Sequence, residues 1–113
     1  MRDLIFFVED ILERSKLIKD SIKEVSYSNF KSNKLLIDAT VRRLEIIGEA
    51  VKNIPESFRS KYPDVEWRKI AGLRDIIIHS YFGIDFEVIW GIIKKDVPVL
   101  KKQIKEILEK ENA

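Results

Sequence analysis

The sequence predicts an all-α protein, and two observations support this fold class. Apolar residues recur at helical spacing along most of the 113-residue chain. No stretch alternates apolar and polar residues with period two for long enough to form a convincing strand. We therefore expect four main helices and one short helix in an up-and-down bundle, folded as a single domain over residues 1–113.

The first main helix is expected near the N-terminus, over about 22 residues. Leu4, Ile11, Ile18 and Val25 recur every seven residues there, so they form one apolar stripe along the helix. The polar stretch SYSNFKSN, residues 26–33, follows the helix. It is expected to be a break, because serine and asparagine favour turns.

The second main helix is expected from Ser32 to Asn53, with a core face of isoleucine, leucine and valine. Gly48 lies beside that face. Glycine costs about 1 kcal/mol relative to alanine inside a helix, so it indicates a close contact with another helix. Pro55 begins the short helical turn PESFRSKY, in a position where the missing N–H is not needed.

The third main helix is expected over residues 65–82, with Asp64 as its N-cap. Gly83 is expected to end this helix, because glycine tolerates the left-handed conformation found at many helix ends. Asp85 is then expected to cap the fourth main helix, residues 86–113. Pro98 is expected to kink or break that last segment.

The composition excludes several classes of protein. The chain has no cysteine, which excludes disulfides and thiolate metal sites. Its 21 Lys and Arg residues are interleaved with 19 acids, and the net charge of +2 does not by itself indicate nucleic-acid binding. No signal peptide is evident and no run approaches the roughly 20 apolar residues of a membrane span. We expect a cytoplasmic protein with no membrane partner.

The stretch LRDIIIHSYFGID, residues 73–85, contains the candidate chemistry. It holds the only histidine of the chain, His79. Arg74 and Tyr81, seven residues apart, are predicted on one face of a helix. Asp75 and His79, four apart, share a neighbouring face and can form a hydrogen bond. Arg74 and His79 are expected to border the same side of the helix.

Two interpretations of these residues are open. In the structural interpretation, Arg74 forms a surface ion pair, and His79 interacts favourably with the negative C-terminal end of the helix dipole. In the functional one, an imidazole with an ordinary pKa of about 6.5 removes a proton from a ribose 2′-hydroxyl. A guanidinium then neutralises the phosphorane, without a metal. Asp75 would hold the imidazole tautomer, and a dimer would supply a second histidine.

The wider sequence resembles the HEPN domain family, and within it the HepT-like toxin branch. RDIIIHSY matches the R-x4-H-x-Y form of the HEPN motif. The flanking stretches RRLEIIGEAVKNIP, YPDVEWRKIAGLRDIIIHSYFGID and VIWGIIKKDVPVL also look like this branch. The resemblance covers nearly the whole chain, most strongly residues 41–100, and all three motif residues are present.

The resemblance implies a dimeric HEPN bundle that acts as a metal-independent endoribonuclease toxin of a toxin–antitoxin module. Two motifs would meet in a cleft and cleave RNA, either tRNA or mRNA, without a cofactor. Arg74 would bind and position the phosphate, His79 would be the catalytic imidazole, and Asp75 would support it. We expect the first and fourth main helices to form the interface and the cleft.

The resemblance also implies a partner, a minimal nucleotidyltransferase antitoxin. This enzyme would transfer AMP from ATP onto Tyr81 and so silence the toxin. The alternative is a non-catalytic HEPN protein that binds nucleotide or regulates a nucleotidyltransferase. A plain helical interaction module is a third interpretation.

Four charged residues of the second main helix fall at helical spacing: Asp38, Arg42, Glu45 and Glu49. They can brace the motif helix or line its cleft, or they can form a ladder of ion pairs within their own helix. Glu45 and Glu49 as a metal pair would lack a second set of ligands.

Four aromatic residues are expected to form a group around the motif: Trp67, Phe82, Phe86 and Trp90. Such a group can stack on bases of a nucleic acid. It can also pack in the core or in a dimer interface, which is the more ordinary role of aromatic side chains.

Overall fold

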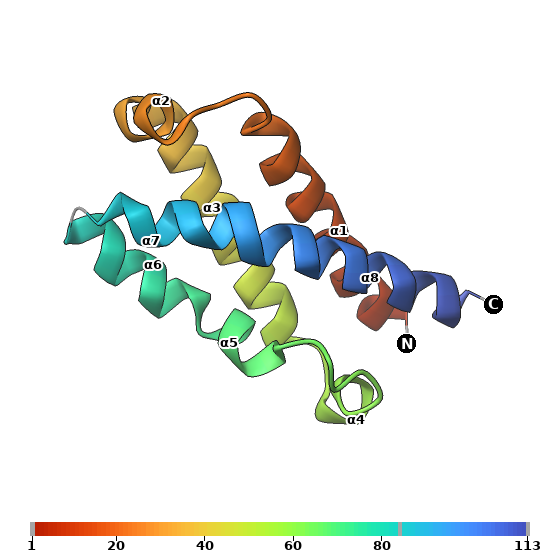
Figure 1. Ribbon diagram of the computed structural model, residues 1–113. Coiled ribbons are helices and arrows are strands. Elements are labelled where there is room, and N and C mark those ends of the chain that lie inside the picture. The colour runs from red at the N-terminus through yellow and green to blue at the C-terminus, as the bar shows by residue number, and fades with distance from the viewer. Residues whose placement is uncertain (1, 84, 113) are drawn as a thin grey trace.

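The computed structural model of the chain describes residues 2–83 and 85–112 and confirms the all-α class, since these ranges contain helices and no strand (Figure 1). The main helices are α1 (Arg2–Ser21), α3 (Lys34–Lys52), a third built from α5 (Trp67–Ala71) and α6 (Leu73–Phe82), and a fourth built from α7 (Phe86–Gly91), η1 (Ile92–Asp96) and α8 (Val97–Glu111). The expected short helix is α4 (Glu56–Arg59). None of the described helices is both long and apolar enough to cross a membrane.

The core lies where α1, α3 and α8 pack together. Ile11 of α1, Ile47 of α3 and Ile104 of α8 have no exposed surface. Fully burying such a side chain contributes about 1.5–3 kcal/mol. In Figure 1, α7, η1 and α8 run end to end across α3 and α1, while α6 lies beside α3 and α7. The motif helix α6 is therefore held in place by packing against other helices.

The region between the first two long helices is not the break that its polar composition predicted. It contains a short helix, α2 (Tyr27–Ser32). The hydroxyl of Ser26 caps α2 by accepting a hydrogen bond from the N–H of Asn29 at 3.1 Å. Phe30 is fully buried, with its ring centroid 5.1 Å from that of Trp90. The burial of Phe30 and the cap from Ser26 therefore stabilise a short helix in this stretch, although most of its residues are polar.

The third main helix differs from the prediction at its start and in its middle. It begins at Trp67, and Asp64 is not its N-cap. The backbone carbonyl of Asp64 instead accepts a hydrogen bond from Gln103 at 3.1 Å. Gly72 divides the helix into α5 and α6, and its N–H donates to the carbonyls of both Arg68 and Lys69. This tightened turn changes the direction of the chain just before the motif.

The close helix contact predicted at Gly48 is confirmed. A Cβ at this position would lie 3.2 Å from the backbone carbonyl oxygen of Ile70 in α5 and 3.9 Å from the Cβ of Leu73 in α6. The backbone of α3 thus passes directly under the junction of α5 and α6. Any side chain larger than hydrogen would press on that junction.

Gly83 ends α6, but not in the left-handed conformation that was expected. Its φ is −78°, within the right-handed region. A Cβ on Gly83 would lie 2.8 Å from the carbonyl oxygen of His79, closer than real side chains come. Glycine is therefore needed here because of a close approach to the preceding turn of backbone.

The last main helix is not broken at Pro98. Asp85 precedes α7 as predicted, although its side chain makes no capping hydrogen bond. The chain then passes through the π-helical turn η1, where the N–H of Val97 reaches back five residues to the carbonyl of Ile92. Pro98 follows directly after this π-helical turn, as the second residue of α8, and the chain stays helical through it.

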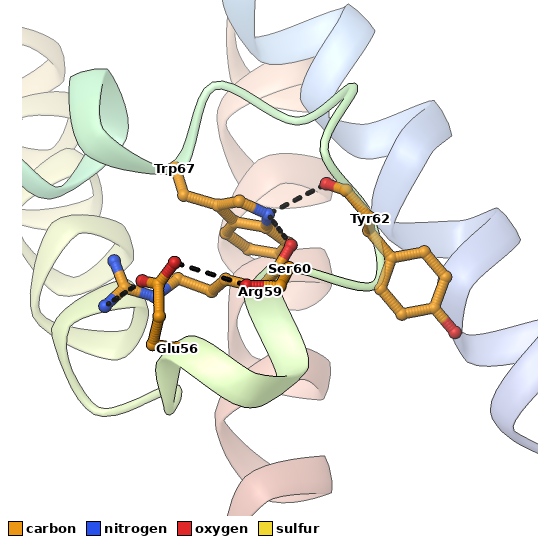
Figure 2. Close-up of polar contacts among 5 residues, drawn as sticks. All are labelled: Glu56, Arg59, Ser60, Tyr62 and Trp67. Atoms are coloured by element: carbon orange, nitrogen blue, oxygen red, sulfur yellow. Dashed lines mark hydrogen bonds and ion pairs between the residues drawn. The ribbon is translucent and has the colours of Figure 1, made fainter.

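Trp67 belongs to the core and to the chain turn before α5, as Figure 2 shows. Its indole N–H donates to the carbonyls of Arg59 at 3.1 Å and Tyr62 at 3.0 Å. Within this turn Glu56 accepts a hydrogen bond from Ser60 and forms an ion pair with Arg59. The core-packing interpretation is therefore confirmed for Trp67.

Candidate active site

The helix α6 turns one side to the core and presents the motif on its other sides. Leu73, Ile77 and Ser80 are buried against the bundle. Arg74 and His79 are exposed, as is Asp75. The spacing of the apolar residues thus anchors α6 and leaves the charged side chains free to meet a ligand or another chain.

Arg74 and Tyr81 both face α3, which confirms the prediction that they share one side of α6. Arg74 lines a pocket of about 430 Å³ between α1, α3 and α6. The charged residues of its wall are Asp10, Arg42, Glu45 and Glu49. The pocket therefore combines two guanidinium groups with three carboxylates, and it is not a simple basic groove.

The hydroxyl of Tyr81 reaches across to α3. It donates a hydrogen bond to Oδ1 of Asp38 at 3.1 Å. This bond, together with the negative charge of Asp38 and partial burial, raises the pKa of the Tyr81 phenol above its ordinary value. Tyr81 therefore keeps its proton, and the carboxylate of Asp38 holds the hydroxyl in a defined direction.

His79 lies on another side of α6, so the structure does not bring it together with Arg74. It lines a shallow groove with Asp75, Ile78, Phe82 and Val88, among others. Five residues along a helix correspond to a rotation of about 140°. The expectation that Arg74 and His79 border the same side is therefore wrong within one chain.

The expected hydrogen bond between Asp75 and His79 is not formed. Both side chains line the same groove, but no hydrogen bond or ion pair joins them among the described residues. Asp75 stands near the imidazole without holding its tautomer in this state. Its supporting role stays a prediction.

The four charged residues predicted at helical spacing in α3 contact the motif or line its pocket. They do not form a ladder of ion pairs with one another. Asp38 bonds to Tyr81, and Arg42, Glu45 and Glu49 line the pocket of Arg74. One ion pair within α3 is described for these residues, from Glu49 to Lys52 at 3.4 Å, and no described ion pair joins the four residues to one another. Two further lining residues, Phe7 and Asp10 of α1, were missed, since nothing in their spacing relates them to a motif far along the chain.

The predicted aromatic group is divided among three places, since Trp67 lies in the turn before α5. Phe82 and Phe86 lie beside the ring of Tyr81, with centroids 5.5 Å and 6.1 Å away in edge-on geometry. Trp90 instead packs with Tyr27 and Phe30. Only the first pair borders the motif.

An apolar patch surrounds His79 on the solvent side. Ile76, Ile78, Phe82 and Val88 are all exposed, and Phe82 most of all at 78%. We call these residues the His79 patch. Large apolar side chains gathered at one groove are typical of surfaces that bind another protein.

Glu45 and Glu49 do not belong to a wider metal site. Within residues 2–83 and 85–112, no group of three or more His, Asp and Glu side chains is placed to hold an ion. Among the described residues, the fold therefore brings no further metal-binding side chains to Glu45 and Glu49.

The chain is similar to proteins that carry ribonuclease names. Residues 11–107 match the HepT-like family model, described as "Ribonuclease HepT-like". A relative from Caldanaerobacter subterraneus, named "Putative RNase", is 48% identical over 105 residues, which cover 93% of this chain and 94% of the relative. A relative from Methanocaldococcus jannaschii with the same designation is 46% identical over 103 residues, covering 91% and 94%.

A third relative, from Thermococcus cleftensis, is named "Probable ribonuclease HepT". It is 42% identical over 101 residues, which cover 89% of this chain and 92% of the relative. No solved structure matches the chain. Because the family model spans most of the sequence and these relatives align along nearly their whole length, the chain belongs to the ribonuclease HepT-like family.

Proposed function

We propose that this protein is a metal-independent endoribonuclease toxin that cleaves RNA, either tRNA or mRNA, at a site formed between two copies of the chain. One observation carries the proposal. A chain of the ribonuclease HepT-like family presents an arginine and its only histidine, Arg74 and His79, exposed on the helix that holds the family motif. These are the groups that phosphodiester cleavage without a metal requires.

The proposed reaction uses the imidazole as a base and the guanidinium as a phosphate-binding group. His79 removes the proton of a ribose 2′-hydroxyl, and the oxygen attacks the neighbouring phosphorus. Arg74 neutralises the charge that builds up on the phosphorane oxygens. The His79 of a second copy protonates the leaving 5′-oxygen. The products are a 2′,3′-cyclic phosphate and a free 5′-hydroxyl.

The location of His79 supports a homodimer. The histidine lies inside the His79 patch, so joining two such patches would cover Ile78 and Phe82 and bring two imidazoles close together. The interface is then expected on α6 and α7. The segment α7 is the first part of the fourth main helix, and the expected contribution of the first main helix stays a prediction.

The proposed control is covalent. A minimal nucleotidyltransferase antitoxin transfers AMP from ATP onto Tyr81. The phenol is only partly buried at the last turn of α6, and its hydrogen-bond partner Asp38 is exposed, so another enzyme can reach it. The adduct adds a negative phosphodiester and a purine on the side of α6 that carries Arg74. Charge and volume then exclude RNA.

RNA cleavage in EDTA by purified protein tests the proposal, after mass spectrometry has shown that Tyr81 is unmodified. The parent is expected to cleave, and Arg74→Ala and His79→Ala are each expected to lose a factor of about 10² to 10⁴ in rate. Both side chains are exposed, so melting temperatures should stay close to that of the parent. Arg68→Ala, an exposed arginine of α5, is the matched control.

Two results would count against the proposal. Motif variants that cleave like the parent would remove Arg74 and His79 from the active site. An unmodified parent that cleaves no RNA would favour the alternative, a non-catalytic HEPN protein that binds nucleotide or regulates a nucleotidyltransferase.

A further inference from the structure

We infer that Asp38 is a catalytic residue of the AMP transfer onto Tyr81: it holds the phenolic hydroxyl and accepts its proton while the oxygen bonds to the α-phosphorus of ATP. This inference rests on the proposed function and deepens it, because it assigns part of the transfer chemistry to the protein that is being modified. The nucleotidyltransferase would supply the bound ATP, and its target would supply the base.

The contact between the two residues joins separate helices. Asp38 lies in the first turns of α3 and Tyr81 in the last turn of α6, 43 residues later. The phenol oxygen donates to Oδ1 of Asp38 at 3.1 Å. A base must lie within hydrogen-bond distance of the proton that it accepts, and this pair meets that condition before any partner binds.

Asp38 is free of competing partners among the described residues. It is exposed, and Arg42, one helical turn further along α3, forms no ion pair with it. The hydrogen bond from Tyr81 is the only hydrogen bond or ion pair of the Asp38 side chain that the described residues show. An unpaired carboxylate can take up a proton without first breaking an ion pair. Its location thus fits a base better than a structural brace.

The ring of Tyr81 is held as well as its hydroxyl. Phe82 and Phe86 pack edge-on against the ring, with centroids 5.5 Å and 6.1 Å away. Two aromatic neighbours limit rotation of the ring, and the hydrogen bond to Asp38 fixes the direction of its O–H. The nucleophilic oxygen is therefore placed before the ATP arrives, which lowers the entropic cost of the reaction.

The chemistry requires the proton of Tyr81 to leave during the transfer. Hydrogen bonding to Asp38 raises the pKa of the phenol, so the phenolate does not form beforehand. As the bond between Oη and the α-phosphorus forms, the bond from that phosphorus to the pyrophosphate oxygen breaks. Pyrophosphate leaves with the electron pair, and the proton moves from Oη to Oδ1 of Asp38.

Transfer of AMP onto Tyr81 also removes the hydrogen bond between Tyr81 and Asp38. An AMP-bearing Tyr81 has no hydroxyl proton to donate, and its phosphodiester carries a negative charge close to the carboxylate of Asp38. Repulsion between the two charges favours moving the phosphodiester away from the carboxylate of Asp38.

Two substitutions of Asp38 test the inference in the whole protein, incubated with the proposed minimal nucleotidyltransferase, Mg²⁺ and ATP. Asp38→Asn keeps the hydrogen-bond acceptor but not the base, and Asp38→Ala removes both. AMP incorporation, followed by mass spectrometry of the Tyr81 peptide, should be slower by a factor of about 10² to 10⁴ in each. Added formate should partly restore Asp38→Ala, because a small carboxylate can occupy the vacated space and accept the proton.

Asp20→Asn is the matched control, since it makes the same change at an exposed acid of α1 and should be modified at the parental rate. Transfer to Asp38→Asn at the parental rate would overturn the inference. Slow transfer in both variants without rescue by formate would also overturn the role as a base. A parent that is never modified would instead reject the proposed AMP transfer itself, and the role of Asp38 with it.

Discussion

The helix α6 places the motif residues on two sides, and this division decides what each of them can contact. Arg74 and Tyr81 face α3, whereas His79 faces an open apolar groove. A substrate phosphate held by Arg74 is therefore not automatically within reach of the imidazole of the same chain. The proposed dimer supplies a second imidazole, and binding of the RNA must then bring its phosphate to both groups.

Tyr81→Phe separates the proposed catalytic role of the motif from its regulation. The substitution removes one partly solvent-exposed hydrogen bond to Asp38, which is worth about 0.5–1.5 kcal/mol. The variant should stay folded and keep much of its RNA cleavage, since Arg74 and His79 are unchanged. It should carry no AMP on the peptide that contains residue 81 after co-expression with the nucleotidyltransferase, and should resist neutralisation. Full neutralisation of this variant would favour inhibition by simple complex formation.

Sequence spacing could nominate the motif residues but not all of their partners. Arg74, His79 and Tyr81 stand within eight residues, so their pattern is visible along the chain. Asp38 lies 43 residues from Tyr81, and its charge at helical spacing is equally consistent with an ion-pair ladder. The contact depends on how α3 and α6 pack, which local spacing does not specify. The same reason explains why Asp10 of α1 was missed as a lining residue.

At the scale of helices, the close approach of α3 to the junction of α5 and α6 positions the motif helix. We predict that Gly48→Leu destabilises the protein by about 1–3 kcal/mol, because the new side chain must displace the backbone at Ile70. Gly91→Ala is the matched control. It has helical dihedral angles and no atom within 4 Å of the added Cβ, so it should stabilise by about 0.5–1 kcal/mol.

Urea unfolding of both variants measures these changes in the free energy of unfolding. The two substitutions should shift the midpoint in opposite directions at an unchanged slope. Equal shifts of the same sign would show that the contact between Gly48 and Ile70 does not control the packing of the helices.

The end of α8 is tied to the turn before α5 by a charged contact that should make stability depend on pH. Tyr62 donates a short hydrogen bond to Glu111, and Lys61 donates to the same carboxylate at 3.1 Å. The bond from Tyr62, then that from Lys61, lowers the pKa of Glu111 below 4.5. Hydrogen bonding to Glu111 and burial raise the pKa of Tyr62 to about 12.

The signs of these shifts predict where the contact stabilises the fold. The contribution of Glu111 is fully present above its unfolded pKa of 4.5 and is lost as the pH falls through the lower folded pKa. The contribution of Tyr62 to stability is fully present below its unfolded pKa of 10.0. It is lost as the pH rises through its folded pKa of about 12. Glu111→Gln should therefore melt below the parent at neutral pH, and the two should converge in acid. A difference in melting temperature that is constant from pH 3 to pH 8 would contradict this assignment.

Helices whose apolar residues recur at regular spacing could be predicted from the sequence. Helices that depend on a single contact could not. The core faces of α1, α3 and α8 follow directly from recurring apolar residues. The helix α2 was missed because it depends on a single buried side chain, Phe30, in a polar stretch. The continuous helix through Pro98 was missed because the π-helical turn before it has no distinct sequence pattern.

For the molecule as a whole, the groove of α6 around His79 is an apolar surface that the other described residues leave exposed. Of the three isoleucines before His79, Ile77 is fully buried and holds α6 in the bundle. Ile76 and Ile78 are instead exposed, together with Phe82. A run of apolar residues in the sequence does not show which of them the fold covers, so the patch became visible only in the folded chain.

The central claim is that RNA is cleaved at a site which needs His79 from both copies of a dimer. Mixing the parent with His79→Ala after exchange of subunits, at constant total protein, measures this directly. If both imidazoles are required, cleavage should follow the square of the parental fraction, so an equal mixture keeps about a quarter of the activity. The double variant His79→Ala/Phe82→Glu is the control, because a charge in the His79 patch should block exchange, and cleavage should then follow the parental fraction itself. With exchange verified by native mass spectrometry of the mixed dimer, a linear dependence in the first mixture would show that one imidazole per dimer suffices and would contradict the requirement for both.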